Sequence, residues 1–444
     1  MEKISIVNKE CTLICDFPGA ITSALRGVGL KWIGDSIYFN AGTIPEEAIT
    51  STAVWGVSVG TGKFTRRAGG DDDCASSFTA TAQSIFVRHN VGLKDEIRTL
   101  EGETLFSEMT EITHFHACKT DSGLVLALIK SGVSSPSEVF TLLVDDSAEP
   151  VQLSDHGHAF DATIGTPKAV SAPSADGKTT IDAVFVAPAT ADGKESKEPL
   201  PTFVLVHGGP YSRITATFMP DYGWSPMVLS AGYAVLTPNY RGSSSRGNAF
   251  ASYAKGGIGS VDYDDVVRVV DHCIKEKLVD PSRVVVGGWS QGGFLSYMCT
   301  TRNYRYTDGT SLGWQFRATI CGAGITDWDT MAITSDAPNF EAELGTAAPW
   351  EMIKSDTRSR KGSAVWEMKD SAKEGRMPPC LILHGKEDVR VPVTQAWAFQ
   401  RGCKKWGLPC EMVLYPREPH VFLERGHIVD MMKRILKFLD IHLA

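Results

Sequence analysis

Residues 283–295, RVVVGGWSQGGFL, decide the fold of the carboxyl-terminal half of the chain. An apolar run typical of a buried strand leads into Gly288-x-Ser290-x-Gly292, and a segment typical of a helix follows. This pattern indicates a nucleophile elbow, in which glycines two positions before and after a serine let a strained turn fold tightly. The sequence therefore predicts that Ser290 is a nucleophile, with the backbone N–H of Gln291 directed at a developing oxyanion.

A base and an orienting acid must accompany such a serine, because a hydroxyl group is a weak nucleophile at its own pKa. Asp388 follows the predicted strand 380–384, and His420 follows the predicted strand 411–415. Both then lie in loops at the carboxyl ends of strands, where open α/β sheets build their sites. The chain order Ser290, Asp388, His420 is also the order expected for an α/β-hydrolase.

Other residues compete for these two roles. Glu387 or Glu418 could supply the acid, and His384 or His427 could supply the base. Position favours Asp388 and His420, because His384 falls within a predicted buried strand and His427 within the last predicted helix.

A second oxyanion donor is expected from the loop His207-Gly208-Gly209-Pro210, which follows the predicted strand 202–207. Its two glycines allow the backbone to approach a substrate carbonyl closely. We predict the N–H groups of Gly209 and Gln291 as the donor pair. His207 is interpreted as a residue that holds this loop by hydrogen bonding.

Strands and helices alternate from residue 166 to residue 444, which predicts a mainly parallel, doubly wound sheet of the α/β-hydrolase type. The predicted strands are 181–186, 202–207, 234–238, 283–288, 317–321 and 380–384, and the predicted helices include 260–277, 393–405 and 424–443.

Residues 1–165 instead predict an all-β domain of short strands. Strand-like segments begin at residues 36, 84 and 123, and a second type of segment recurs at 53–58 and 138–143. A period of about 40 to 50 residues with several strands per unit is typical of β-propeller blades. A two-sheet sandwich is the alternative.

Composition limits the possible partners and the compartment. The 444 residues are 43% hydrophobic and carry a net charge of −8, which argues against nucleic acid as a partner. No apolar run reaches the length of a membrane span, and the amino-terminal residues lack the unbroken apolar core of a signal peptide. Ten cysteines without metal-binding spacing predict free thiols, a cytoplasmic location and no metal or organic cofactor.

Five motifs together resemble the prolyl oligopeptidase family of serine peptidases, especially its acylaminoacyl-peptidase and dipeptidyl-peptidase-5 branch. The family joins a β-propeller to an α/β-hydrolase domain, so the resemblance implies Ser290, Asp388 and His420 as the triad and Gly209 with Gln291 as oxyanion donors. The motifs are HGGP at 207–210, NYRGSSSRG at 239–247, GGWSQGG at 287–293, GKEDVRVP at 385–392 and EPH at 418–420.

The resemblance also implies residues that bind substrate. Arg390 is similar to an arginine that approaches substrate carbonyls in relatives. Ile325, Trp328 and Met331 fall where the family builds part of an apolar pocket, although plain packing explains the three equally well.

Two departures from the family affect the expected function. About 160 residues precede the hydrolase domain, enough for three or four blades, and the open sheet edges of such a fragment favour a homodimer. A paired-glutamate motif for a free amino terminus is lacking, which argues against strict dipeptide release. The expected function is a serine peptidase acting on short or acylated peptides. The alternative is an esterase, amidase or cyclase acting on a small metabolite, such as a polyketide or peptide natural product of secondary metabolism.

Overall fold

The computed structural model describes residues 2–4, 11–18, 30–145, 149–159, 164–189, 196, 198–218, 223–345, 350 and 359–444. Its contacts divide the chain into two compact units. One unit holds Met1–Gly132, Pro136–Ala159 and Ser244–Ser252, and the other holds Val133–Ser135, Phe160–Ser243 and Tyr253–Ala444. The domain boundary between residues 165 and 166 stays a prediction.

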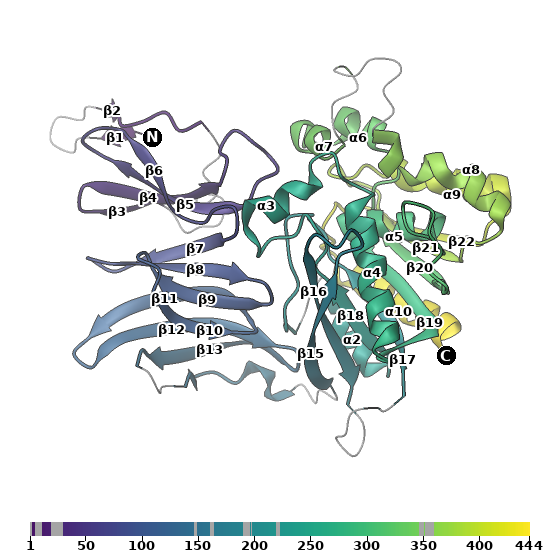
Figure 1. Ribbon diagram of the computed structural model, residues 1–444, viewed down its shortest axis with the longest axis horizontal. Helices are drawn as coiled ribbons and strands as arrows, with labels where there is room; N and C mark the ends of the chain where they lie inside the picture. Colours follow the sequence, from purple (N-terminus) through teal and green to yellow (C-terminus); the bar gives the residue numbers. More distant parts are fainter. Residues whose placement is uncertain are drawn as a thin grey trace. The chain divides into compact units, whose positions relative to one another are not determined.

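The first unit consists of antiparallel sheets, drawn from purple to blue in Figure 1. Three of them have four strands each, in the orders β3-β4-β5-β6, β10-β9-β8-β7 and β11-β12-β13-β14. Each is a meander of chain-consecutive strands, the form of a propeller blade. The strands are β1 (Glu2–Ile4), β2 (Cys11–Leu13), β3 (Lys31–Ile33), β4 (Ser36–Gly42), β5 (Thr52–Ser58), β6 (Phe64–Ala68), β7 (Cys74–Ala80), β8 (Ile85–Val91), β9 (Lys94–Thr99), β10 (Thr104–Glu108), β11 (Glu111–Thr120), β12 (Gly123–Gly132), β13 (Ser135–Leu143) and β14 (Val151–Gln152).

The recurring segments of the sequence occupy equivalent places in these sheets. Those beginning at residues 36, 84 and 123 form β4, β8 and β12, the second strand of each sheet, and those at 53–58 and 138–143 form the third strands β5 and β13. The predicted all-β, partial propeller-like architecture is confirmed. The described residues of this unit form three four-stranded sheets, so the alternative of a two-sheet sandwich is wrong.

Apolar side chains hold successive sheets of this unit together. Val54 of β5 and Phe78 of β7 belong to one buried apolar cluster, and Phe86 of β8 and Leu126 of β12 belong to another. The buried amide of Asn40 reinforces the first of these contacts, because its Nδ2 lies 3.3 Å from the carbonyl oxygens of both Ala53 and Ala75. The sheets therefore share continuous cores, as neighbouring propeller blades do.

The second unit contains one eight-stranded sheet, in the order β15-β16-β18-β17-β19-β20-β21-β22. β15, β16 and β18 pair antiparallel, and every later pair is parallel, which confirms the predicted mainly parallel sheet. The strands are β15 (Ile164–Pro173), β16 (Thr180–Pro188), β17 (Leu200–Val206), β18 (Ala234–Pro238), β19 (Val279–Trp289), β20 (Ala318–Gly322), β21 (Cys380–Gly385) and β22 (Cys410–Tyr415).

Helices cover this sheet, whose inner strands β18, β20 and β21 are buried at every residue. α5 packs beside α4 and α8, α9 packs beside α8, and α10 packs with α2 (Figure 1). In the second unit these helices are α2 (Trp224–Ser230), α4 (Val261–Lys275), α5 (Gln291–Thr301), α6 (Trp328–Thr334), α7 (Pro338–Gly345), α8 (Ala364–Glu374), α9 (Thr394–Trp406) and α10 (Arg425–Leu443); α3 (Gly247–Ala251) belongs to the first unit.

The parallel register brings the carboxyl ends of five strands to one edge of the sheet. Val206 of β17 is paired with Gly288 of β19, and Trp289 is paired with Gly322 of β20. Gly385 at the end of β21 is paired with Tyr415 at the end of β22. The loops that follow these strands therefore start side by side, and they carry Gly209, Ser290, Asp388 and His420.

Candidate active site

Ser290 lies at the turn between β19 and α5, with φ 59° and ψ −118°. A positive φ is rare for a residue with a side chain, so the turn is a strained one. Two hydrogen bonds fix it: the Ser290 N–H donates to Gly322 O over 2.9 Å, and the Phe294 N–H donates to Ser290 O over 2.9 Å. The nucleophile elbow predicted from the sequence is therefore present in the backbone.

The glycines around Ser290 are required by close packing. A Cβ atom on Gly288 would lie 2.2 Å from Val206 O, and one on Gly292 would lie 2.0 Å from the same oxygen. A Cβ on Gly293 would lie 2.1 Å from Gly322 O. Backbone atoms of β17 and β20 occupy the space of each missing side chain, so only glycine fits.

The three predicted triad residues are joined by hydrogen bonds. His420 Nε2 lies 2.9 Å from Ser290 Oγ, and His420 Nδ1 lies 2.7 Å from Asp388 Oδ2. The carboxylate is fully buried, whereas the imidazole keeps 19% of its side-chain surface exposed. This arrangement lets the imidazole take a proton from the hydroxyl while the carboxylate fixes its tautomer and stabilises the imidazolium.

The surroundings of Asp388 keep its carboxyl group ionised. Burial acts to raise its pKa, but hydrogen bonds with His384 and His420 outweigh burial and hold the pKa below the ordinary value. The Val391 N–H donates to the other carboxylate oxygen over 2.8 Å. His384 lies within β21, fully buried, with Nε2 2.8 Å from Val391 O. Its bond to Val391 holds the loop that carries Asp388. Among the described residues, His384 forms no hydrogen bond with Ser290.

The loop after β17 lies against the elbow. A Cβ atom on Gly208 would lie 3.1 Å from Trp289 O and 3.4 Å from the Cβ of Ser290. Gly209 follows with φ 131°, a conformation that favours glycine. Gln291 is the first residue of α5, where N–H groups lack an acceptor inside the helix.

His207 holds this loop from within the protein. Its Nδ1 lies 2.7 Å from Gly208 O, its Nε2 lies 2.9 Å from Ser243 Oγ, and its ring stacks on Tyr240 with centroids 4.5 Å apart. Burial lowers the pKa of His207 to about 4, so the ring is neutral at pH 7. The predicted role of His207 in fixing the loop by hydrogen bonds is confirmed.

Trp289 ties the His420 loop to the elbow, and it was not among the residues predicted from the sequence. Trp289 Nε1 donates a hydrogen bond of 2.9 Å to His420 O, and the Trp289 ring meets Phe422 edge to face at 5.0 Å. Its position directly before Ser290 is the one sequence signal that could have revealed it.

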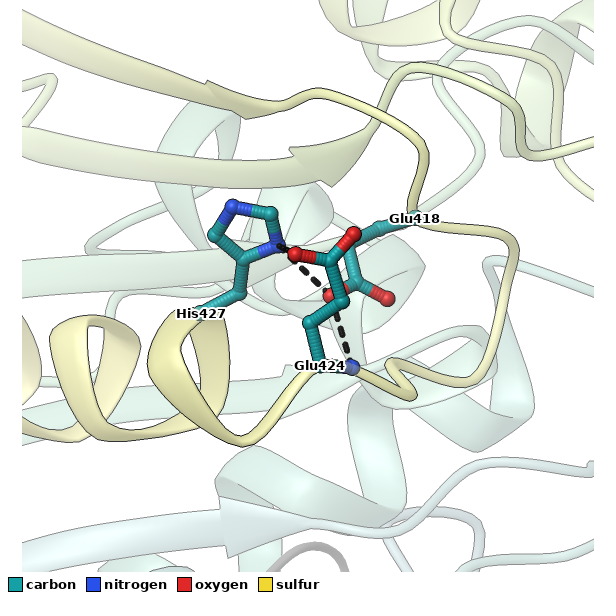
Figure 2. A group of neighbouring side chains, drawn as sticks. All are labelled: Glu418, Glu424 and His427. Atoms are coloured by element: carbon teal, nitrogen blue, oxygen red, sulfur yellow. Dashed lines mark hydrogen bonds and ion pairs between the residues drawn. The ribbon is translucent and has the colours of Figure 1, made fainter.

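Glu418, Glu424 and His427 form the cluster drawn in Figure 2, and their ligand atoms lie within 4.8 Å of one another. Such a set could bind a metal ion, but its atoms already have partners. Glu418 accepts hydrogen bonds on both oxygens, and Glu424 binds the guanidinium of Arg417 over 2.7 and 2.8 Å. We therefore assign the cluster to the structure of the loop.

The residues predicted to bind substrate occupy different surroundings. Arg390 is half exposed, with Nε 2.5 Å from Asp336 Oδ1. Ile325, Trp328 and Met331 are at most 3% exposed, and the Trp328 ring packs edge to face on Phe294. Burial of the three agrees with packing, and contact of any of the four with substrate stays a prediction.

A mainly parallel sheet that carries a serine elbow, an aspartate and a histidine in this chain order defines the α/β-hydrolase class. The sequence model that describes the prolyl oligopeptidase family matches residues 220–444, just over half of the chain. The chain belongs to this family.

Relatives in sequence cover much of this chain but less of their own length. The chain is 27% identical over 317 residues to the uncharacterized peptidase YuxL of Bacillus subtilis, a match that covers 69% of this chain and 44% of the relative. It is 30% identical over 249 residues to acylamino-acid-releasing enzyme 1 of Oryza sativa, covering 55% of this chain and 30% of the relative. The chain thus spans less than half the length of these relatives.

Solved structures share the fold over most of the chain. An acylaminoacyl peptidase in complex with Z-Gly-Gly-Phe-chloromethyl ketone has a TM-score of 0.75 at 22% identity, covering 92% of this chain and 62% of that one. A puromycin hydrolase has a TM-score of 0.71 at 21% identity, covering 93% and 60%. The fold class predicted from the sequence is confirmed.

Further predictions concern thiols and membranes. The described cysteines other than Cys11 carry free thiols. Among the described helices, none combines the length and the apolar character needed to cross a membrane. Residues 5–10 of the amino-terminal stretch on which the signal-peptide argument depends lie outside the described residues.

Proposed function

We propose that this chain is a serine peptidase that works through an acyl-enzyme. The observation that carries the proposal is the continuous chain of hydrogen bonds from Asp388 through His420 to Ser290, at the carboxyl edge of the sheet. Ser290 is the nucleophile, His420 the general base and then the general acid, and Asp388 the residue that orients the imidazole.

The reaction begins when His420 Nε2 accepts the Ser290 hydroxyl proton and Oγ attacks the substrate carbonyl carbon. Negative charge then develops on the carbonyl oxygen, and the N–H groups of Gly209 and Gln291 stabilise it. The imidazolium gives its proton to the leaving amine. Water activated by the same imidazole then hydrolyses the acyl-enzyme and regenerates the serine.

Short or acylated peptides are the proposed substrates. Support comes from the acylamino-acid-releasing relatives in sequence and from the acylaminoacyl peptidase among the solved structures. Arg390 would approach a substrate carbonyl, since its guanidinium is half exposed next to the Asp388 loop. Ile325, Trp328 and Met331 would form the floor of a pocket for an apolar side chain.

A panel of substrates tests the peptidase proposal against the small-molecule alternative. The compared quantity is kcat/KM divided by the uncatalysed rate of the same substrate. It should be higher for acylaminoacyl p-nitroanilides and short acylated peptides than for p-nitrophenyl esters of comparable acyl chains. Ser290→Ala should abolish turnover of both classes. Turnover confined to esters would contradict the peptidase proposal and favour the esterase alternative.

We also propose that the protein works in the cytoplasm without a nucleic-acid partner, on the basis of its free thiols and its net charge of −8. A homodimer is the proposed assembly, because β6 and β10 each have a strand neighbour on only one side among the described strands. Sedimentation equilibrium gives the test: a single species of the monomer mass would contradict dimerisation.

A further inference from the structure

One carboxylate spans the loop that carries His420. Glu418 Oε2 accepts a hydrogen bond from the Leu423 N–H over 2.7 Å, and Oε1 accepts one from the Glu424 N–H over 3.0 Å. Its side chain is fully buried. Because His420 lies between the two ends that this side chain joins, the loop is closed into a ring around a buried anion.

A third bond to the same carboxylate comes from the last helix. His427 Nδ1 lies 2.7 Å from Glu418 Oε1, and His427 belongs to the first turn of α10, as Figure 2 shows. The carboxylate therefore lies at the amino-terminal end of a 19-residue helix, where the helix dipole favours negative charge. Hydrogen bonds to an ionised acceptor are stronger than those between neutral groups, so the ring is held firmly.

The backbone of Glu418 also contacts the loop of the triad acid. Its carbonyl oxygen accepts a hydrogen bond of 3.0 Å from the N–H of Glu387, the residue before Asp388. A Cβ atom on Gly385 would lie 2.3 Å from this carbonyl oxygen, so the two loops are in direct backbone contact. Glu418 thus joins the two loops that carry the acid and the base.

We propose that Glu418 is the positioning residue for His420, a role that rests on the proposed function of the triad. Its buried carboxylate sets the distance from His420 Nε2 to Ser290 Oγ by fixing both ends of the loop, while Trp289 Nε1 fixes the middle through His420 O. Glu418 does not touch substrate and acts only through His420.

Glu418→Gln tests this role, because it keeps the size of the side chain and replaces one acceptor oxygen with an N–H donor. That donor would face a backbone N–H or the His427 ring, so the loop must shift. A misplacement of about 1 Å in a catalytic group can cost about 100-fold in rate. We expect the second-order rate of Ser290 labelling by a fluorophosphonate, and kcat, to fall about 100-fold.

The split between kcat and KM separates positioning from loss of stability. Both are measured below the onset of thermal unfolding of each variant, and KM should stay close to the wild-type value, because Glu418 makes no substrate contact. Glu411→Gln is the matched control, since Glu411 is an exposed glutamate on β22 paired with Arg434, and it should label at the wild-type rate.

The possible results are distinct. Labelling of Glu418→Gln at the wild-type rate would overturn the positioning role and leave the triad intact. Absence of labelling in the wild type would contradict the proposed function itself, and this inference with it. If Glu418→Gln does not fold, His427→Phe keeps the ring but removes the third bond, together with the 3.5 Å contact to Glu424. A fall in kcat with KM unchanged supports the proposal, and unchanged kcat refutes it.

Discussion

Substitution of Gly292 by alanine tests the packing that places the elbow under the loop after β17. The added Cβ atom would lie 2.0 Å from Val206 O and 3.1 Å from His207 O. Side-chain carbons essentially never approach a backbone oxygen closer than 3.0 Å, so α5 and the end of β17 must separate by about 1 Å. Both atoms are backbone, and no rotation of a side chain can relieve the contact.

This separation moves the two proposed oxyanion donors apart, because Gln291 directly precedes Gly292 and Gly209 follows the end of β17. A displacement of about 1 Å in such a group predicts a fall in kcat of about 100-fold. Overpacking in a tight core also costs about 1 to 3 kcal/mol of unfolding free energy. The fall in kcat should therefore be larger than the loss of folded protein alone would cause.

The assay compares kcat on one acylaminoacyl p-nitroanilide and the denaturant midpoint for Gly292→Ala, Gly426→Ala and the wild type. Gly426 is the matched control, since a Cβ atom there meets no other atom within 4 Å at the start of α10. It should match the wild type in kcat, and its denaturant midpoint should be equal or slightly higher, because alanine favours a helix over glycine by up to about 1 kcal/mol. A Gly292→Ala enzyme with full kcat and full stability would refute the steric account of the elbow.

Two further predictions concern buried groups of the second unit. Because the pKa of His207 falls from 6.5 to about 4 on folding, the unfolded chain binds its proton more tightly, and acidification from pH 7 to pH 4 should remove about 3 kcal/mol of stability through this residue; chemical denaturation at both pH values should show a weaker pH dependence for His207→Gln, and an unchanged dependence would contradict the assignment. Arg241 is buried and binds both oxygens of the buried Asp265 over 2.8 Å, so Arg241→Met should cost about 3 to 5 kcal/mol by leaving that carboxylate unpaired, and Arg241→Met/Asp265→Leu should recover much of the loss; equal denaturant midpoints for the single variant and the wild type would show that the pair contributes nothing.

The sequence predicts those features that local chemistry determines. The elbow could be predicted because the GxSxG motif places glycine where a side chain would collide with neighbouring backbone. At both Gly288 and Gly292, the atom that a Cβ would meet is Val206 O. Asp388 and His420 could be predicted because each lies in the loop after a parallel strand. The carboxyl ends of parallel strands meet at one edge of the sheet.

Other features depend on residues far apart in the chain and leave no local signal. The pairing of Arg390 with Asp336 joins residues 54 positions apart, and Trp289 reaches His420 across 131 positions. Ser244–Ser252 belongs by its contacts to the first unit, although strands of the second unit precede and follow it in the chain. Glu418 could be predicted only as a rival acid, because its bonds to Leu423 and Glu424 require the folded loop.

Intact-protein mass after treatment with a fluorophosphonate tests the triad most directly. The wild type should gain the mass of one phosphonyl group, and Ser290→Ala should gain none, since only a hydroxyl activated by His420 reacts at neutral pH. Absence of an adduct on the wild type, or an equal adduct on Ser290→Ala, would contradict the assignment of Ser290 as the nucleophile.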